Sequence, residues 1–301
     1  MRRIGYTLLC CLLTLASCGD KDPVIVPVEG LAVEPARLEA EVGGTGTLVA
    51  QITPENATDK TVFWSSGDES IATVVDGVVT GLKTGRTTIL ARTGPFEASC
   101  AVTVGVLTEA VDLGLGVQWA NKNLGACTPT EYGDYFAWGE TQVKDTYTDA
   151  SYQWKKDGKL TRYCALAATD LWYGNTTPDE WVVLDAEDDA ARVYLGDGWR
   201  MPTREEQEAL KKECKVSKEE LDGVAGFRVT GPNGNSIFIP ASGRKSEKGL
   251  EFDGKYAYLW SSSLYTTVST SAHSYNLLAG MAICGFSDRA IGLPVRPVKA
   301  E

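Results

Sequence analysis

Residues 61–91 read TVFWSSGDESIATVVDGVVTGLKTGRTTILA, and this stretch decides the fold of the first part of the chain. Apolar and β-branched residues alternate with polar residues in three short runs, Thr61–Trp64, Ile71–Val74 and Arg86–Ala91. Turn residues such as Asp76-Gly77 separate the runs. Alternation between turn signals is typical of half-buried β-strands. The stretch therefore predicts an all-β sandwich, in which the strands pack their apolar faces into one core.

The same pattern extends over residues 28–104, with a further run at Gly46–Ile52. Several motifs follow one another in this range: Pro54-Glu55-Asn56-Ala57-Thr58, Val62-Phe63-Trp64-Ser65-Ser66, Ile71-Ala72-Thr73-Val74, Gly77-Val78-Val79-Thr80-Gly81 and Gly85. Their order resembles the group 2 bacterial Ig-like domain. The resemblance implies an Ig-like sandwich with Trp64 in its core. It also implies a spacer that holds a distal domain away from the cell, with direct binding as the alternative.

The N-terminus has the features of an export signal. Arg2 and Arg3 precede a short apolar run that ends at Leu15-Ala16-Ser17-Cys18. A positive segment, a short apolar segment and small residues before a cleavage site predict a secretory signal rather than a spanning helix. The last four residues resemble the bacterial lipobox. This implies removal of residues 1–17 and lipidation of Cys18, while an ordinary signal peptide is the alternative.

Residues 18–27 contain Asp20, Asp22, Pro23 and Pro27, which predicts an extended tether after the lipid. The acidic residues resemble the tract that follows the lipidated cysteine in surface-exposed lipoproteins of the Bacteroidota. We therefore expect an outer membrane lipoprotein that is exposed on the cell surface. The membrane is then a partner of the protein through the lipid on Cys18.

Composition excludes several kinds of function. The 301 residues carry a formal net charge of -11 and only one histidine. An acidic chain without a basic stripe is not expected to bind nucleic acid. One histidine excludes sites that need two imidazoles, and no Cys-x-x-Cys motif is present, so we expect no metal and no cofactor. Five cysteines lie beyond Cys18, and the sequence leaves their pairing open: Cys100, Cys127, Cys164, Cys214 and Cys284.

Residues 105–301 are expected to form a second, α+β domain with much loop. Carboxylate caps or capping boxes predict short helices from Asp185, from Thr203 to about Lys212, and from Ser217 to before Gly223. Apolar runs predict strands at Gly226–Val229, Ser236–Ile239, Ala257–Ser261 and Pro294–Val298. Seven of the eight tryptophans lie in this part of the chain, which indicates either a large core or a surface for stacking sugars.

The ordered motifs of this second part resemble the Fibrobacter succinogenes major paralogous domain. They are Val111–Ala120, Tyr132–Glu140, Glu187–Ala191, Trp199–Thr203, Ile239–Gly243, Trp260–Ser263 and Val295–Val298. The resemblance spans almost all of residues 105–301. It implies a fold akin to C-type lectins and to the formylglycine-generating enzyme.

We predict no catalytic residues. Formylglycine chemistry needs two cysteines near the C-terminus, and only Cys284 is present there. The acids Glu187-Asp188-Asp189 are better explained by helix capping and surface solvation than by a calcium site or by glycoside cleavage. Ser261–Ser263 with His273 is too loose a set for a catalytic triad.

The predicted binding segment runs from Leu264 to Arg289, between two strands that return to the core. We expect this segment to be a long loop whose aromatic, amide and guanidinium groups contact a ligand. The candidate residues are Tyr265, His273, Tyr275, Asn276, Phe286 and Arg289. In the alternative, Tyr275 and Phe286 only attach the loop to the core, and the loops of residues 147–181 bind the ligand instead.

The sequence thus predicts a lipid-anchored, non-catalytic surface protein. Its Ig-like stalk would present a lectin-like head to a glycan, a mucin or a protein, as in adhesion. A structural or accessory subunit of a surface appendage or of a glycan-uptake complex is the alternative. An enzyme acting on glycans is the third and least favoured hypothesis.

Overall fold

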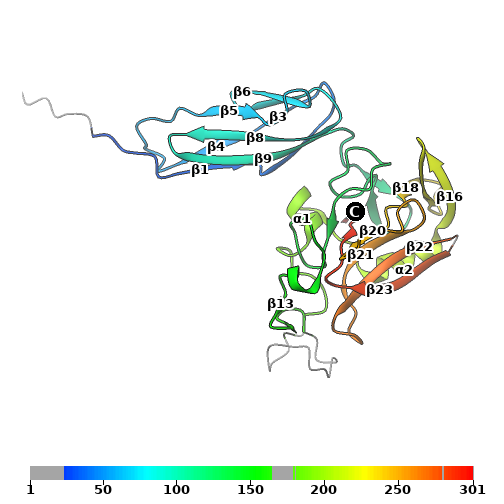
Figure 1. Cartoon of the computed structure of the whole chain (residues 1–301). Helices are drawn as coiled ribbons and strands as arrows, with labels where there is room; N and C mark the ends of the chain where they lie inside the picture. Colours follow the sequence, from blue (N-terminus) through cyan, green and yellow to red (C-terminus); the bar gives the residue numbers. More distant parts are fainter. Residues whose placement is uncertain (1–23, 165–178, 180, 280, 301) are drawn as a thin grey trace, which may run out of the picture.

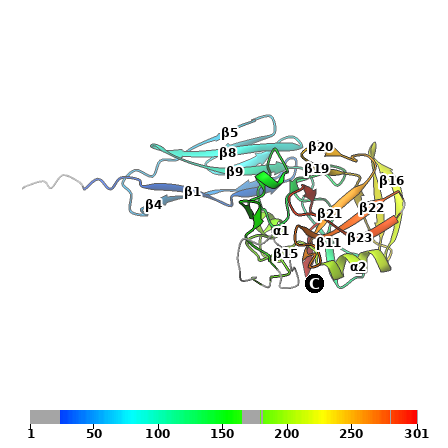
Figure 2. The same ribbon diagram turned by 60° about the horizontal axis from the view of Figure 1, so that its bottom comes forward.

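The computed structural model describes residues 24–164, 179, 181–279 and 281–300. The signal segment and Cys18 lie outside the described residues. Figure 1 shows two bodies, an elongated one made of long strands and a rounder one that contains the C-terminus. Figure 2 shows the same two bodies from another side, where the loops around α1 partly overlap the end of the sandwich. No helix within the described ranges is both long enough and apolar enough to cross a membrane.

The first body is an all-β sandwich, as the alternation predicts. Its strands are β1 (Gly30–Glu34), β2 (Arg37–Ala40), β3 (Thr45–Thr47), β4 (Val49–Thr53), β5 (Phe63–Ser66), β6 (Ala72–Val75), β7 (Val78–Gly81), β8 (Gly85–Thr93) and β9 (Phe96–Val104). They form a sheet of order β2-β9-β8-β5, a sheet of order β3-β7-β6 and the pair β1-β4. Trp64 is partly buried and packs against a core that includes Val79, Ile89 and Val102. Asp76 and Gly77 form the predicted turn between β6 and β7, both with positive φ.

The second body is built mainly from short antiparallel sheets. Its strands are β10 (Ala110–Asp112), β11 (Val117–Ala120), β12 (Tyr135–Phe136), β13 (Lys155–Lys156), β14 (Lys159–Leu160), β15 (Trp199–Arg200), β16 (Lys215–Leu221), β17 (Val224–Thr230), β18 (Ser236–Pro240), β19 (Arg244–Ser246), β20 (Gly249–Glu251), β21 (Ala257–Leu264), β22 (Ser271–Leu278), β23 (Met281–Asp288), β24 (Leu293–Pro294) and β25 (Val298–Ala300). The larger sheets have the orders β10-β11-β25-β15, β16-β17-β18 and β21-β22-β23. The helices are η1 (Asp149–Ser151), α1 (Ala190–Leu195) and α2 (Arg204–Glu213).

The helix α2 confirms the capping box predicted at Thr203. The Thr203 hydroxyl accepts from the backbone N–H of Glu206, and the Glu206 carboxylate accepts from the backbone N–H of Thr203. The short helix α1 begins at Ala190 rather than at Asp185, because Asp189 is the residue whose carboxylate caps it. Figure 1 shows α2 alongside β22 and β23.

Two sequence predictions are wrong for local structure. Ser217–Glu220 belongs to β16, not to a helix, because every residue of that strand pairs with β17 across a turn at Asp222-Gly223. Leu264–Arg289 is not a long loop but contains the paired strands β22 and β23. At Ser217–Glu220 the strand is favoured because seven consecutive residues of β16 pair with β17. This ladder satisfies more backbone N–H and C=O groups than one capping box can.

Three tryptophans of the second body are core residues. Trp119, Trp138 and Trp260 are almost fully buried. The Trp138 indole donates to the carbonyl of Ser261, and the Trp260 indole donates to the carbonyl of Phe136, so each ring is fixed to a distant segment. The core explanation therefore holds for these three side chains, whereas Trp181 is 42% exposed.

The two bodies meet through residues 105–109, whose backbone is held on both sides. Gly105 donates to the carbonyl of Ala40 in the sandwich, and Val106 donates to the carbonyl of Cys127 in the second body. Side chains cross the joint as well: the pairs are Thr108–Glu39, Lys122–Glu39, Arg86–Asp134 and Arg37–Tyr194. The connection is therefore an ordered part of the fold.

Candidate functional site

The predicted binding residues lie on and around the hairpin of β22 and β23. The register places His273 opposite Phe286 and Tyr275 opposite Cys284, so these side chains share one face of the sheet. Asn276 lies opposite Ile283 on the other face. Tyr265 lies just after β21, and Arg289 follows β23. The six candidates are therefore divided among different surroundings.

Three of the six come together as one aromatic group, here called the aromatic surface: Tyr265, His273 and Phe286. Phe286 is exposed, Tyr265 is partly buried and His273 is buried. The rings of Tyr265 and Phe286 are stacked, with centroids 4.3 Å apart and planes 11° apart. The His273 ring meets Tyr265 edge-on, at a centroid distance of 5.1 Å. Phe286 is 51% exposed. Because Tyr265 backs one face of the half-exposed Phe286 ring, the pair offers a small apolar platform to a ligand.

His273 supports this platform in its neutral form. Its Nδ1 lies 3.3 Å from the carbonyl of Gly285, and its side chain is largely buried. Burial lowers the pKa of His273 below its ordinary value and outweighs the opposing hydrogen bond to Gly285. At neutral pH the imidazole is therefore uncharged.

Tyr275 and Asn276 do not belong to the aromatic surface. Tyr275 is fully buried and packs in the core with Leu210 of α2 and Phe227 of β17. That environment raises the pKa of its phenol through desolvation. Asn276 is only 9% exposed, and it lies on the opposite face of the sheet. The sequence prediction that both residues face a ligand is not supported by these positions, because α2 and the core cover Tyr275 and the sheet turns Asn276 away.

Arg289 is a buried cross-link rather than a surface donor. Its guanidinium donates to the hydroxyl of Tyr152 at 3.0 Å and to the carbonyls of Arg162, Ser269 and Tyr163 at 2.9, 3.2 and 3.3 Å. The side chain is 1% exposed. Four of its five N–H groups donate to protein acceptors and the side chain is buried, so Arg289 holds three loops together and presents no exposed edge to a ligand.

The alternative site in the loops of residues 147–181 contains a second aromatic group, although residues 165–178 and 180 lie outside the described ranges. The Arg162 guanidinium lies over Trp154, Tyr163 and Trp181, at 5.0, 5.4 and 4.7 Å from the ring centroids. It also pairs with Asp185 and Glu187, each at 2.9 Å. The planar face of this guanidinium therefore packs against aromatic rings, and its N–H groups pair with carboxylates of the protein.

The acids Glu187, Asp188 and Asp189 have separate structural roles. Asp189 caps α1 and also accepts from the backbone N–H of Met201, which confirms the capping explanation. Asp188 is 6% exposed and accepts from the Tyr163 hydroxyl, so surface solvation is wrong for this residue. Burial raises the pKa of both Asp188 and Asp189. No group of three or more metal-ligating side chains occurs within the described ranges.

Within the described ranges no disulfide joins the five cysteines beyond Cys18, and Cys100, Cys127, Cys214 and Cys284 are buried or partly buried thiols. Burial raises the pKa of Cys100 and of Cys214 to about 11. Such thiols are protonated at neutral pH and are poor nucleophiles. Their role is packing.

Comparison with known families identifies the sandwich. Residues 27–103 match the family model of the bacterial Ig-like domain (group 2). This part of the chain is a bacterial Ig-like domain. The fold and the family thus agree with the motif resemblance of residues 28–104.

Curated relatives match only this Ig-like domain. An α-L-arabinofuranosidase of Bifidobacterium longum subsp. longum is 42% identical over 85 residues, which are 27% of this chain and 8% of that protein. An Ig-like virion protein of Serratia phage KSP90 is 37% identical over 84 residues, which are 27% of this chain and 33% of that protein. The chain thus spans a small part of the length of these relatives.

Solved structures give only a faint likeness. Domains 4 and 5 of the S-layer protein SbsC are 23% identical at a TM-score of 0.24, over 26% of this chain and 51% of that chain. Domains 5–6 of SbsC are 14% identical at a TM-score of 0.24, over 89% of this chain and 96% of that chain. At these TM-scores the likeness carries no argument about function.

Proposed function

We propose that the protein is a lipid-anchored, non-catalytic binding protein of the cell surface, in which the Ig-like domain carries a lectin-like head. An Ig-like domain of this family fits a surface or structural role. The observation that carries the binding role is the stacking of the half-exposed Phe286 ring on the partly buried ring of Tyr265. The proposed ligand is a glycan or a mucin.

The chemistry of the aromatic surface suits a sugar. The C–H face of a pyranose ring packs against a flat aromatic ring, while its hydroxyls need donors and acceptors beside that ring. Arg204 and Glu208 of α2, the helix that packs against β22 and β23, form an ion pair at 2.8 Å and are both 47% exposed. The N–H groups and the carboxylate oxygen that this pair leaves unused are the proposed partners for the sugar hydroxyls.

The carboxylates that the sequence singled out have structural partners, which favours binding over catalysis. Asp188 is bound by Tyr163, and Asp189 is bound by two backbone N–H groups. A glycosidase needs one carboxyl group to donate a proton and another to attack or to activate water. Release of reducing sugar from a mucin or a plant glycan by the purified chain would contradict the proposal.

The test is binding of the full chain to a glycan array and to immobilised mucin, with Phe286→Ala as the variant. Loss of half of the stacked pair should weaken binding by about tenfold, since aromatic contacts of this kind contribute on the order of 1 kcal/mol beyond area burial. Met281→Ala is the matched control, because Met281 is 61% exposed on the same strand but outside the aromatic surface. Equal binding by wild type and Phe286→Ala would refute the proposed site.

A protein ligand or a place in a surface assembly is the second candidate. The strand β23 lies at the edge of its sheet, and Met281, Ile283 and Phe286 along it are exposed. An edge strand with unpaired backbone groups can accept a strand of another protein. A stoichiometric complex that co-purifies with the protein, and that is lost when Ile283 is changed to Lys, would favour this candidate.

A further inference from the structure

A polar face of the Ig-like domain lies against the head. The register of β2, β9 and β8 aligns Arg37 with Ala101 and Thr88, and aligns Glu39 with Thr103 and Arg86. Residues in register on neighbouring strands point to the same side of a sheet. These charged and hydroxyl side chains therefore form a polar row on one side of the sheet. In an isolated sandwich this side would face solvent, whereas here it faces the head.

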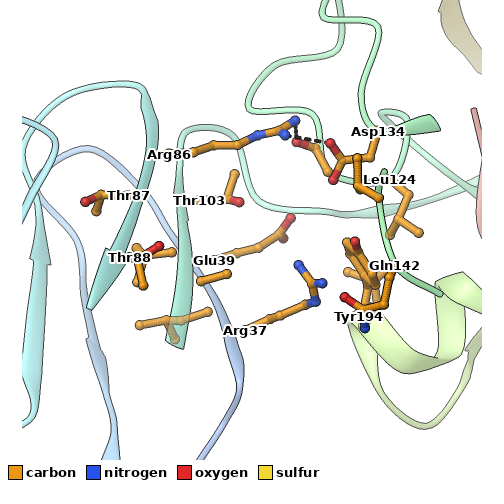
Figure 3. Close-up of a pocket in the computed structure, with 16 residues that line it drawn as sticks. Arg37, Glu39, Arg86, Thr87, Thr88, Thr103, Leu124, Asp134, Gln142 and Tyr194 are labelled. Carbon is orange, nitrogen blue, oxygen red and sulfur yellow. Dashed lines mark hydrogen bonds and ion pairs between the residues drawn. The ribbon is translucent and has the colours of Figure 1, made fainter. Parts of the chain in front are cut away.

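The head borders this face on one side, so that the two bodies form an open groove in which Arg86, Thr88 and Ala101 remain exposed. A cavity of about 420 Å³ lies between the two bodies, with strands of the sandwich on one side and residues of the head on the other. Figure 3 shows Arg37 and Glu39 reaching from the sandwich toward Tyr194 and Gln142 of the head. Cavities from about 300 Å³ upward accommodate small ligands. The groove is thus large enough for one sugar residue.

Arg37 is held in place without using its hydrogen-bond donors. Its guanidinium carbon lies 3.5 Å from the centroid of the Tyr194 ring, which stacks the planar group on the aromatic face. Within the described part of the chain, no carboxylate pairs with Arg37 and no acceptor takes its N–H groups. A stacked guanidinium keeps its N–H edges free, and those edges match a carboxylate with two parallel hydrogen bonds.

The other charges of the groove neutralise one another. Arg86 donates to Asp134 at 2.6 Å and also to the carbonyl of Gly125. Glu39 accepts from Lys122 at 2.8 Å, and Lys122 is 1% exposed. These two pairs leave the Arg37 guanidinium as the uncompensated charge among the described residues that line the groove, so the groove favours an anion.

Neutral polar groups surround this charge. Thr88 and Thr103 point from the sandwich into the same space, and Gln142 approaches from the head. The two hydroxyls have no hydrogen-bond partner among the described residues. Hydroxyls and an amide are donors and acceptors at once, as the hydroxyls of a sugar require. A bare carboxylate would leave these groups unused.

We propose that the groove between the two domains binds the carboxylate of an acidic sugar, with Arg37 as the anion-binding residue. This proposal rests on the proposed function because it takes the ligand to be a glycan. The groove is, however, a second site, separate from the aromatic surface. Arg37 pairs with the carboxylate through two N–H groups. Thr88, Thr103 and Gln142 bind ring hydroxyls, and Tyr194 keeps the guanidinium in position.

The experiment is a titration of the full chain with D-glucuronate, with D-glucose and with acetate, followed by calorimetry and by saturation-transfer NMR. D-Glucuronate should bind, whereas D-glucose lacks the charge and acetate lacks the hydroxyls. Arg37→Ala should weaken glucuronate binding by at least about tenfold, the effect expected for a charge-assisted hydrogen-bonded pair. Thr103→Val keeps the side-chain shape and should weaken binding less.

Arg92→Ala is the matched control. Arg92 lies on β8, in the same sheet as Arg37, is largely exposed and pairs with Glu97 outside the groove. It should leave glucuronate binding unchanged. The melting temperature of Arg37→Ala, measured beside that of Arg92→Ala, separates loss of the site from loss of the fold.

The proposal would be overturned by equal affinity of Arg37→Ala and wild type, by equal affinity for glucuronate and glucose, or by no binding of glucuronate. Binding of acetate as tight as that of glucuronate would also overturn it, because the site would then recognise no sugar. Mucin binding that is lost in Phe286→Ala but kept in Arg37→Ala would leave the proposed function standing even if the groove fails. Loss of glucuronate binding in Arg37→Ala alone would support the groove whatever happens at the aromatic surface.

Discussion

Replacing Arg289 with Ala distinguishes most sharply between a surface role and a core role for this residue. The sequence placed Arg289 in a ligand-binding loop, where removal would cost affinity but not stability. The structure buries it instead, with four hydrogen bonds from one guanidinium to three carbonyls and one hydroxyl. The guanidinium carbon also lies 4.9 Å from the centroid of the Trp138 ring.

The expected loss of stability follows from these contacts. A hydrogen bond from a charged donor contributes about 1.5–3 kcal/mol, and removal of one side of a buried charged network costs about 3–5 kcal/mol in measured cases. Alanine would remove every donor and leave a cavity lined by polar acceptors. We expect the free energy of unfolding of the head to fall by about 3–5 kcal/mol, which is a large part of the roughly 5–15 kcal/mol of an ordinary domain.

Urea unfolding followed by tryptophan fluorescence measures this change, because seven of the eight tryptophans lie after residue 105. Phe286→Ala serves as the control, since a half-exposed side chain should change the stability by well under that amount. An Arg289→Ala protein that unfolds within about 0.5 kcal/mol of wild type would refute the reasoning, because that is the range of ordinary surface substitutions.

Two further outcomes are expected. Glu206→Gln should destabilise the protein at neutral pH but not in acid: although burial raises the pKa of Glu206, Arg200 and the backbone of Thr203 lower it more, so its contribution is present above the ordinary carboxyl pKa and is lost as the pH falls through the lowered value. Thermal unfolding of both proteins across this pH range checks the sign, and a difference that grows in acid would contradict it. Cys18→Ala should release the protein from membranes or block its processing, as fractionation and the mature mass will show; a membrane-bound variant of mature size would argue against lipidation.

The Ig-like domain could be predicted from the sequence because its information is local. Alternation fixes which side chains face the core, and Asp76-Gly77 fixes where the chain reverses. At Ser217–Glu220 two local signals compete, a capping box and the Asp222-Gly223 turn. The turn prevails, since it permits pairing over the full length of β16 and β17. The turn dipeptide was the signal that could have found this hairpin.

The candidate site could be predicted only in part, because strand alternation does not say what covers a face. His273 and Tyr275 point to the same side of β22, yet Tyr275 lies under α2 while His273 lies beside the exposed Phe286. Only tertiary packing distinguishes them. The buried role of Arg289 could not be predicted for the same reason, since the acceptors that surround it come from segments far apart in the sequence.

The groove could not be predicted from the sequence either, because it depends on how the two domains are joined. The alternation Arg37-x-Glu39 and Arg86-x-Thr88 marks a polar side of the sheet, but sequence alone does not show that a second domain covers it. The cover depends on residues 105–109. A side chain at Gly105 would place its Cβ 2.2 Å from the carbonyl oxygen of Cys127, so the backbones meet too closely for any other residue. A flexible spacer would let the two walls of the groove separate, whereas this close contact keeps the Tyr194 ring over Arg37. The Ig-like domain is therefore more than a stalk in this chain: it forms one wall of the site that we propose, and the head forms the other.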